Sequence, residues 1–167
     1  MDYVFQDLPL HVLLVHVVIV ATPLLALALV VAGAWPAARR VLWAPCLVGA
    51  AVLVPLALVT IEAGKWLEQR VPPAPLIQEH TAQGEDIVPW VIAIAVVAAA
   101  LAAWSVLELV ARRRDRSIGR GAVVGASVVL TLAALVVGAG ATWTIVQIGE
   151  SGSRAVWEGG FSDEPLE

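Results

Sequence analysis

Three histidines and one glutamate are the residues of this chain with the clearest capacity for chemistry. His11 and His16 lie at the start of a long apolar segment, whereas His80 and Glu150 lie in polar stretches between or after such segments. Two neutral imidazoles can hold a haem iron from opposite sides, and imidazoles with a carboxylate can hold a transition metal. An ionisable side chain in a membrane span is a functional candidate by default, because burying it in lipid is costly.

The sequence therefore predicts a polar site built from these residues. The predicted cofactor ligands are His11, His16 and His80, the predicted metal ligands are His11, His80 and Glu150, and Glu62 and Lys65 complete the predicted cluster. Three interpretations stay open: a haem b site, a site for another transition metal, and a cluster without a cofactor. In the third, the same side chains tie helix ends together by hydrogen bonds.

The two histidines of the first segment point in different directions. Five residues on an ideal helix turn a side chain through about 140° and raise it by about 7.5 Å, so we do not expect His11 and His16 to share a metal. Alignment of the apolar segments at their arginine-rich ends puts His11 and His80 roughly 6 Å apart in height, with His16 deeper and Glu150 higher. His80 is therefore the expected partner of His11.

Four apolar segments must position these residues. The chain has 167 residues, of which 60% are hydrophobic and 14% are charged. The predicted spans are residues 8–34, 41–63, 87–110 and 121–148, followed by a polar tail over 149–167. A membrane-spanning helix needs about 20 apolar residues, and each segment is long enough. The sequence thus predicts one all-α domain, an integral membrane four-helix bundle in the lipid bilayer, with Asp7 and Pro9 marking the first helix start.

The basic residues predict the orientation of this bundle. Seven of the ten lie in the first and third connectors, namely Arg39, Arg40, Arg112, Arg113, Arg114, Arg116 and Arg120. Short loops rich in arginine are retained in the cytoplasm. We therefore expect a multi-pass plasma-membrane protein with both termini outside and every histidine on the outer side.

Several functional classes have no support in the sequence. The single cysteine, Cys46, excludes an intramolecular disulfide and a c-type haem motif. No phosphate-binding glycine loop, serine-elbow motif or zinc-protease helix is present, so no catalytic constellation is recognisable and enzymatic activity stays open. The basic connector is explained by cytoplasmic retention, and nucleic acid is not an expected partner.

Four motifs in chain order resemble one bacterial membrane family. They are LPLHVLLVH, EAGKWLEQR, HTAQGED and GESGSRAVW, and together they extend over nearly the whole chain. The resemblance is to the family called domain of unknown function 2231, and the last motif resembles its actinobacterial branch. It implies a four-helix fold, a plasma-membrane location and, through members fused to Rieske or cytochrome-like modules, partners in respiratory electron transfer. Many relatives carry histidine in the position of Glu150, which implies a ligand set altered in this chain.

Overall fold

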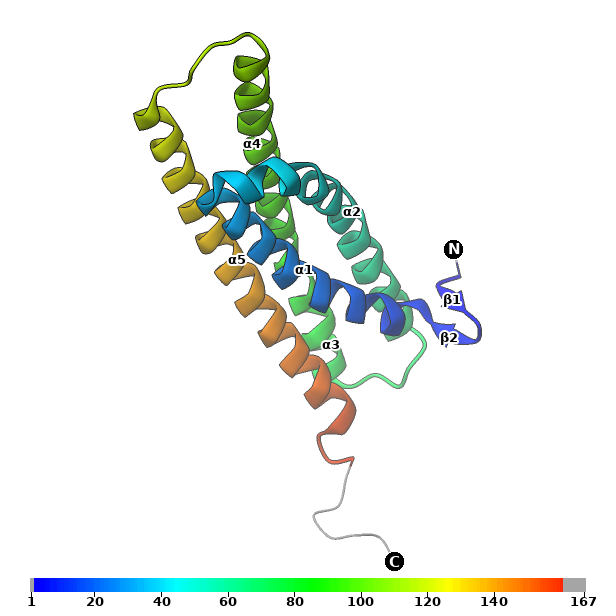
Figure 1. Ribbon diagram of the computed structural model, residues 1–167. Helices are drawn as coiled ribbons and strands as arrows, with labels where there is room; N and C mark the ends of the chain where they lie inside the picture. The colour runs from blue at the N-terminus through cyan, green and yellow to red at the C-terminus, as the bar shows by residue number, and fades with distance from the viewer. Residues whose placement is uncertain (1, 161–167) are drawn as a thin grey trace, which may run out of the picture.

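The computed structural model describes residues 2–160, which form five α-helices, one 3-10 helix and one small hairpin (Figure 1). The elements are β1 (Val4–Phe5), β2 (Leu8–Pro9), α1 (Leu10–Ala34), α2 (Pro36–Glu68), α3 (Pro75–Gln83), η1 (Gly84–Ile87), α4 (Val88–Arg113) and α5 (Arg120–Trp157). Helices α1, α2 and α5, together with the run from α3 to α4, are long and apolar enough to cross a membrane. The predicted all-α four-helix bundle is confirmed.

The four long helices pack around a core of aliphatic and small side chains. α1 packs on α2 and α5, and α4 packs on the same two helices from the other side (Figure 1). Leu29, Ile94 and Leu101 are fully buried in this core. Many of the valine and leucine side chains on the outer surfaces of the helices are exposed, as lipid contact requires.

Small residues bring α1 and α5 into close contact. A methyl group added at Gly138 would lie 2.9 Å from the Cβ of Ala26, and one added at Gly33 would lie 2.9 Å from Thr131. Such close approach of backbones is typical of helix pairs in membranes. From Ala26 to Gly33 the chain advances seven residues on α1, and the facing positions on α5 go back by seven, from Gly138 to Thr131. The two helices are therefore antiparallel with one register, which matches positions on α1 in height to positions on α5.

Two helices extend further than the hydropathy pattern indicates. α2 begins at Pro36, directly after Trp35, because proline is favourable in the first turn of a helix. The predicted connector that holds Arg39 is therefore helical. α5 continues to Trp157, so the predicted tail is helical up to that residue, and an ion pair of 2.6 Å between Glu150 and Arg154 spans one turn of it. Residues 161–167 of that tail lie outside the described part of the chain.

The chain begins with a hairpin that the sequence did not indicate. Gln6 and Asp7 have φ angles of 49° and 62° and form the turn between β1 and β2. The expected helix cap at Asp7 is therefore wrong, and α1 begins after Pro9 without a side-chain cap. Tyr3 packs edge-on against Trp66, with ring centroids 6.3 Å apart, which places the hairpin beside the end of α2.

The bundle has two ends, which we call the histidine end and the arginine end. The histidine end holds His11 and His80, and the arginine end holds Arg39 and the connector between α4 and α5. Arg39 contacts Glu108 and Ser127, yet α4 and α5 extend beyond this level by about 8 and 10 Å at 1.5 Å per residue (Figure 1). The expected alignment of all four helices at this end is wrong, because the link between α1 and α2 is a single residue that turns early.

Candidate functional site

The structure brings His11 and His80 together at the histidine end. Their ring centroids are 6.2 Å apart, and the ring planes meet at 75°. His11 lies in the first turn of α1 and His80 lies in α3, and both side chains are half-buried. The sequence-based prediction that these two histidines are neighbours in height agrees with this placement.

His11 is held by the backbone of α2. Its Nδ1 lies 2.9 Å from the carbonyl oxygen of Thr60. Because a carbonyl can only accept, Nδ1 carries the proton and donates it. One turn further along α2, Gly64 leaves room for the ring, since a Cβ there would come within 2.9 Å of Nδ1.

His80 is held by α5 through a relay. Its Nδ1 lies 3.0 Å from the hydroxyl oxygen of Ser151, and that hydroxyl donates its proton to the carbonyl of Ile148 at 2.9 Å. A serine hydroxyl has a single proton, so it must accept from His80. Gly152 packs against the same ring, because an added Cβ would lie 2.8 Å from Cε1 of His80.

Both imidazoles are therefore in the tautomer that metal sites use. A metal-binding histidine typically donates one ring N–H to a protein oxygen, which orients the ring and makes the other nitrogen more basic. In His11 and His80 this assignment leaves the Nε2 lone pair available. Two metal–nitrogen bonds of about 2.0–2.1 Å put the ring centres of two imidazoles roughly 5–6 Å apart, close to the 6.2 Å between His11 and His80.

The other predicted residues are not brought to this pair of histidines. His16 is exposed on another face of α1, where its Nδ1 lies 2.6 Å from the carbonyl oxygen of Val12. Glu150 is exposed and pairs with Arg154. Within residues 2–160, no group of three or more histidine, cysteine, aspartate or glutamate side chains is arranged to hold a metal ion. The donor set at the histidine end is thus the two imidazoles, and the roles predicted for His16 and Glu150 stay predictions.

The remaining members of the predicted cluster form an ion-pair group between α2 and η1. Lys65 lies 3.1 Å from a carboxylate oxygen of Glu62 and 2.7 Å from one of Glu85. All three side chains are at least one-third exposed, so solvent screens these pairs. This group ties the segment before α4 to the end of α2, the helix that also holds His11.

A second polar cluster, which the sequence did not predict, lies at the arginine end. Arg39 is 0% exposed and forms a two-pronged pair with Glu108, with its Nη2 3.0 Å from Oε1 and its Nε 3.4 Å from Oε2. Its remaining nitrogen, Nη1, donates to the hydroxyl of Ser127 and the carbonyl of Gly33, at 3.2 and 3.1 Å. Trp104 donates its indole N–H to Glu108 at 3.0 Å. We call these five residues the Arg39 cluster; it joins all four long helices.

A signal for the Arg39 cluster was present in the sequence. Glu108 is an acidic residue near the end of an otherwise apolar run, and such a charge requires a partner when it is buried. The sequence pattern places Arg39 in the connector between the first two predicted spans, outside the bundle. The early start of α2 at Pro36 places it inside the bundle instead.

Comparison with known proteins adds no relative. No family model, curated protein or solved structure matches this chain. The resemblance to the family called domain of unknown function 2231 therefore rests on the four motifs alone and stays a prediction.

Proposed function

We propose that this protein is a multi-pass plasma-membrane protein that binds haem b or another transition metal between His11 and His80, as a component associated with respiratory electron transfer. The observation that supports this most directly is the shared tautomer of the two imidazoles, whose ring centroids lie 6.2 Å apart. The family resemblance supports the respiratory association. The lipid bilayer and other respiratory-chain subunits are the partners in this proposal.

The two histidines fit the donor set of either group. A haem iron or a copper ion would supply one-electron transfer when bound. His11 and His80 would bind it, the carbonyl of Thr60 and the hydroxyl of Ser151 would orient the rings, and Gly64 would leave space for His11 against α2. Because His11 and His80 come from α1 and α3, binding would also cross-link these helices.

We propose further that the histidine end is extracytoplasmic, with both termini outside. The arginine-rich connector between α4 and α5 supports this orientation. The test introduces a cysteine at Ser117 or at Ser153, both exposed, in a background with Cys46 replaced by alanine. In intact cells a membrane-impermeant thiol reagent should label the Ser153→Cys variant and spare the Ser117→Cys variant; the opposite pattern would reverse the orientation.

The cofactor proposal is tested on the purified wild-type protein by elemental analysis and by visible spectra of the oxidised and dithionite-reduced forms. We expect either one metal ion per chain or the sharp reduced bands of bis-imidazole haem. The signal should be lost in the His11→Ala and His80→Ala variants and kept in His16→Ala, the matched control. A colourless protein without stoichiometric metal, after expression with haem and metal supplied, would contradict the proposal.

The second candidate is an accessory membrane subunit without a cofactor. The hydrogen bonds from His11 to α2 and from His80 to α5 favour it, because they tie helix ends together at the histidine end. Under this alternative, the His11→Ala variant loses about 1 kcal/mol of unfolding free energy, and no optical or metal signal depends on the residue. The same spectra therefore separate the two candidates.

A further inference from the structure

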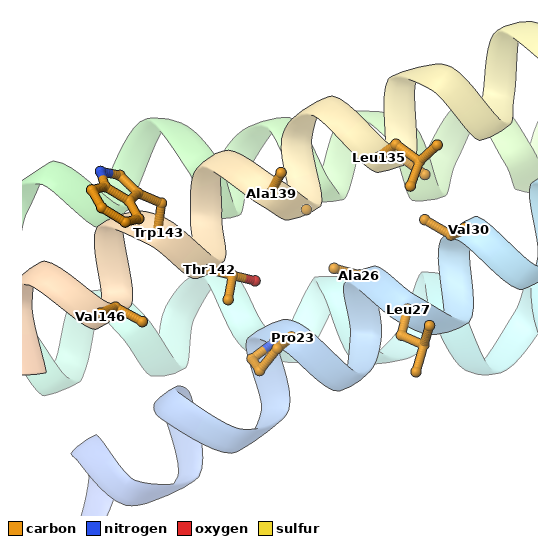
Figure 2. A pocket seen from close by; sticks show the side chains of 11 residues that line it. Pro23, Ala26, Leu27, Val30, Leu135, Ala139, Thr142, Trp143 and Val146 are labelled. Carbon is orange, nitrogen blue, oxygen red and sulfur yellow. The ribbon is translucent and has the colours of Figure 1, made fainter.

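An apolar groove runs along the surface between α1 and α5. It has a volume of about 440 Å³ and lies open on one side (Figure 2). Pro23 and Leu27 line it from α1, and Ala139 and Val146 line it from α5. Apart from the hydroxyl of Thr142 and the indole of Trp143, its lining is hydrocarbon.

The close contacts between α1 and α5 give the height of this groove in the bundle. Ala26 lies opposite Gly138 and Gly33 lies opposite Thr131, and continuation of this register puts His16 level with Ile148. Ile148 ends the apolar run of α5, so we place the boundary of the hydrocarbon region at the level of Ile148 and His16. The groove runs from there towards the middle of the spans.

Polar side chains stand directly above the groove on both helices. Residues seven or eleven apart on a helix return to within about 20° of the same face. By this rule His16 shares the face of α1 that carries Pro23 and Leu27, and Glu150 and Arg154 share the face of α5 that carries Trp143. His16, Glu150 and Arg154 are all exposed, and by the same register Glu150 lies about 3 Å and Arg154 about 9 Å above the level of His16.

We propose that the groove binds one phospholipid of the leaflet at the histidine end. An acyl chain lies between α1 and α5 against Ala139 and Leu27, and the phosphate lies against Nε and Nη1 of Arg154, whose Nη2 pairs with Glu150. Arginine offers paired N–H donors that match the oxygens of a phosphate group. A hydrocarbon molecule without a headgroup would contact the apolar lining alone and would not need Arg154. The site is independent of the proposed metal site, because His11 and His80 lie on other faces.

A phospholipid fits the groove better than a second copy of the chain does. A helix is about 10 Å across with its side chains and would bridge the groove, whereas a single hydrocarbon chain can enter it. The floor is formed where the small residues Ala26 and Gly138 meet. Trp143, which is 65% exposed, stands at the rim of the groove.

The experiment is native mass spectrometry of the purified protein after incubation with phosphatidylglycerol in detergent. The wild type should retain one phospholipid per chain. The Ala139→Phe variant, which fills the groove, should lower the retained fraction about fivefold, and Arg154→Gln should lower it about threefold, as loss of a charge-assisted contact predicts. Ala99→Phe, on an exposed position of α4, and Arg70→Gln, on an exposed arginine at the same end, are the matched controls and should retain lipid as the wild type does.

Two results would overturn the proposal. One is equal lipid retention by the wild type and the Ala139→Phe variant. The other is a dimer without retained lipid that the Ala139→Phe variant dissociates, because the occupant would then be a second copy of the chain. Circular dichroism of each variant separates loss of the site from loss of the fold, and the Arg154→Gln variant tests the headgroup contact without filling the groove.

Discussion

Polar side chains lie among the helices at both ends of this bundle, but they differ in burial and in how completely they are hydrogen-bonded. At the arginine end, the guanidinium of Arg39 is fully buried and each of its three nitrogens has a partner. At the histidine end, His11 and His80 are half-buried, and each uses one ring nitrogen for a protein oxygen. The first arrangement completes its hydrogen bonding within the chain, and the second keeps a lone pair on each ring for another partner.

This difference separates a structural role from a binding role. Within residues 2–160, no buried side-chain nitrogen or oxygen lacks a hydrogen-bond partner, so the Arg39 cluster contains no unpartnered buried polar atom. A completed buried network stabilises one packing of its helices and is costly to interrupt. The imidazole pair can be interrupted at lower cost, because its members lie near the surface. The predictions below test this contrast, from the largest expected effect to the smallest.

The largest effect is expected from the Arg39→Ala and Glu108→Ala variants. Each leaves an unpaired charge inside the bundle, so we expect a loss of about 3–5 kcal/mol in unfolding free energy. Denaturant titration in detergent micelles measures it, with Arg40→Ala, on an exposed neighbour, as the control. A loss of unfolding free energy below about 1 kcal/mol would show that the Arg39 cluster does not have the structural role assigned to it.

A smaller effect on stability, with an added effect on binding, is expected from Gly64→Ala and Gly152→Ala. The new methyl groups would lie 2.9 and 2.8 Å from the rings of His11 and His80, so the imidazoles must move. Overpacking of this kind costs about 1–3 kcal/mol, and metal or haem binding should weaken with it. Gly149→Ala is the control, because nothing lies within 4 Å of a methyl group there. Unchanged binding in both variants would remove the imidazole pair as the ligand site.

Replacement of Ser151 by alanine should affect binding more than stability. It removes the acceptor that holds the Nδ1 proton of His80, and loss of such a partner typically weakens metal affinity by about 10–100-fold. Unfolding free energy should fall by no more than about 1 kcal/mol. Isothermal titration with Zn²⁺ measures the first quantity, and Ser153→Ala, on the same helix, is the control. Equal affinities in the two variants would contradict the proposed relay.

The smallest effect is expected from His16→Ala. This side chain is exposed, and among residues 2–160 its ring bonds only to its own helix, at the carbonyl of Val12. Both unfolding free energy and metal content should stay within error of the wild type. A loss of bound metal would restore His16 to the ligand set that the sequence predicted.

Much of this architecture could be predicted from the sequence, because an uncharged apolar run of about 20 residues is typical of a membrane-spanning helix and the chain has four such runs. The structure also brings His11 and His80 together, although the alignment of helix ends from which their closeness was expected is wrong. The Arg39 cluster did not, since charge counting treats an arginine near a turn as a loop residue and cannot tell that α2 begins at Pro36. The structure does not bring His16 and Glu150 to this pair, because His16 lies on another face of α1 and Glu150 pairs with Arg154. The local ion pair of Glu150 with Arg154 could have been read from their spacing.

The measurement that tests the contrast most directly is the shift in unfolding temperature that Zn²⁺ or haemin produces in the wild type, in Arg39→Ala and in a His11→Ala, His80→Ala double variant. A ligand that binds only the folded state stabilises it, by about 2.7 kcal/mol at a concentration of 100 times Kd. We predict that one of the two ligands raises the unfolding temperature of the wild type and of Arg39→Ala by similar amounts, with Arg39→Ala starting lower, and leaves the double variant unmoved. A shift that persists in the double variant, or the absence of any shift in the wild type with both ligands, would contradict a binding role for the histidine end.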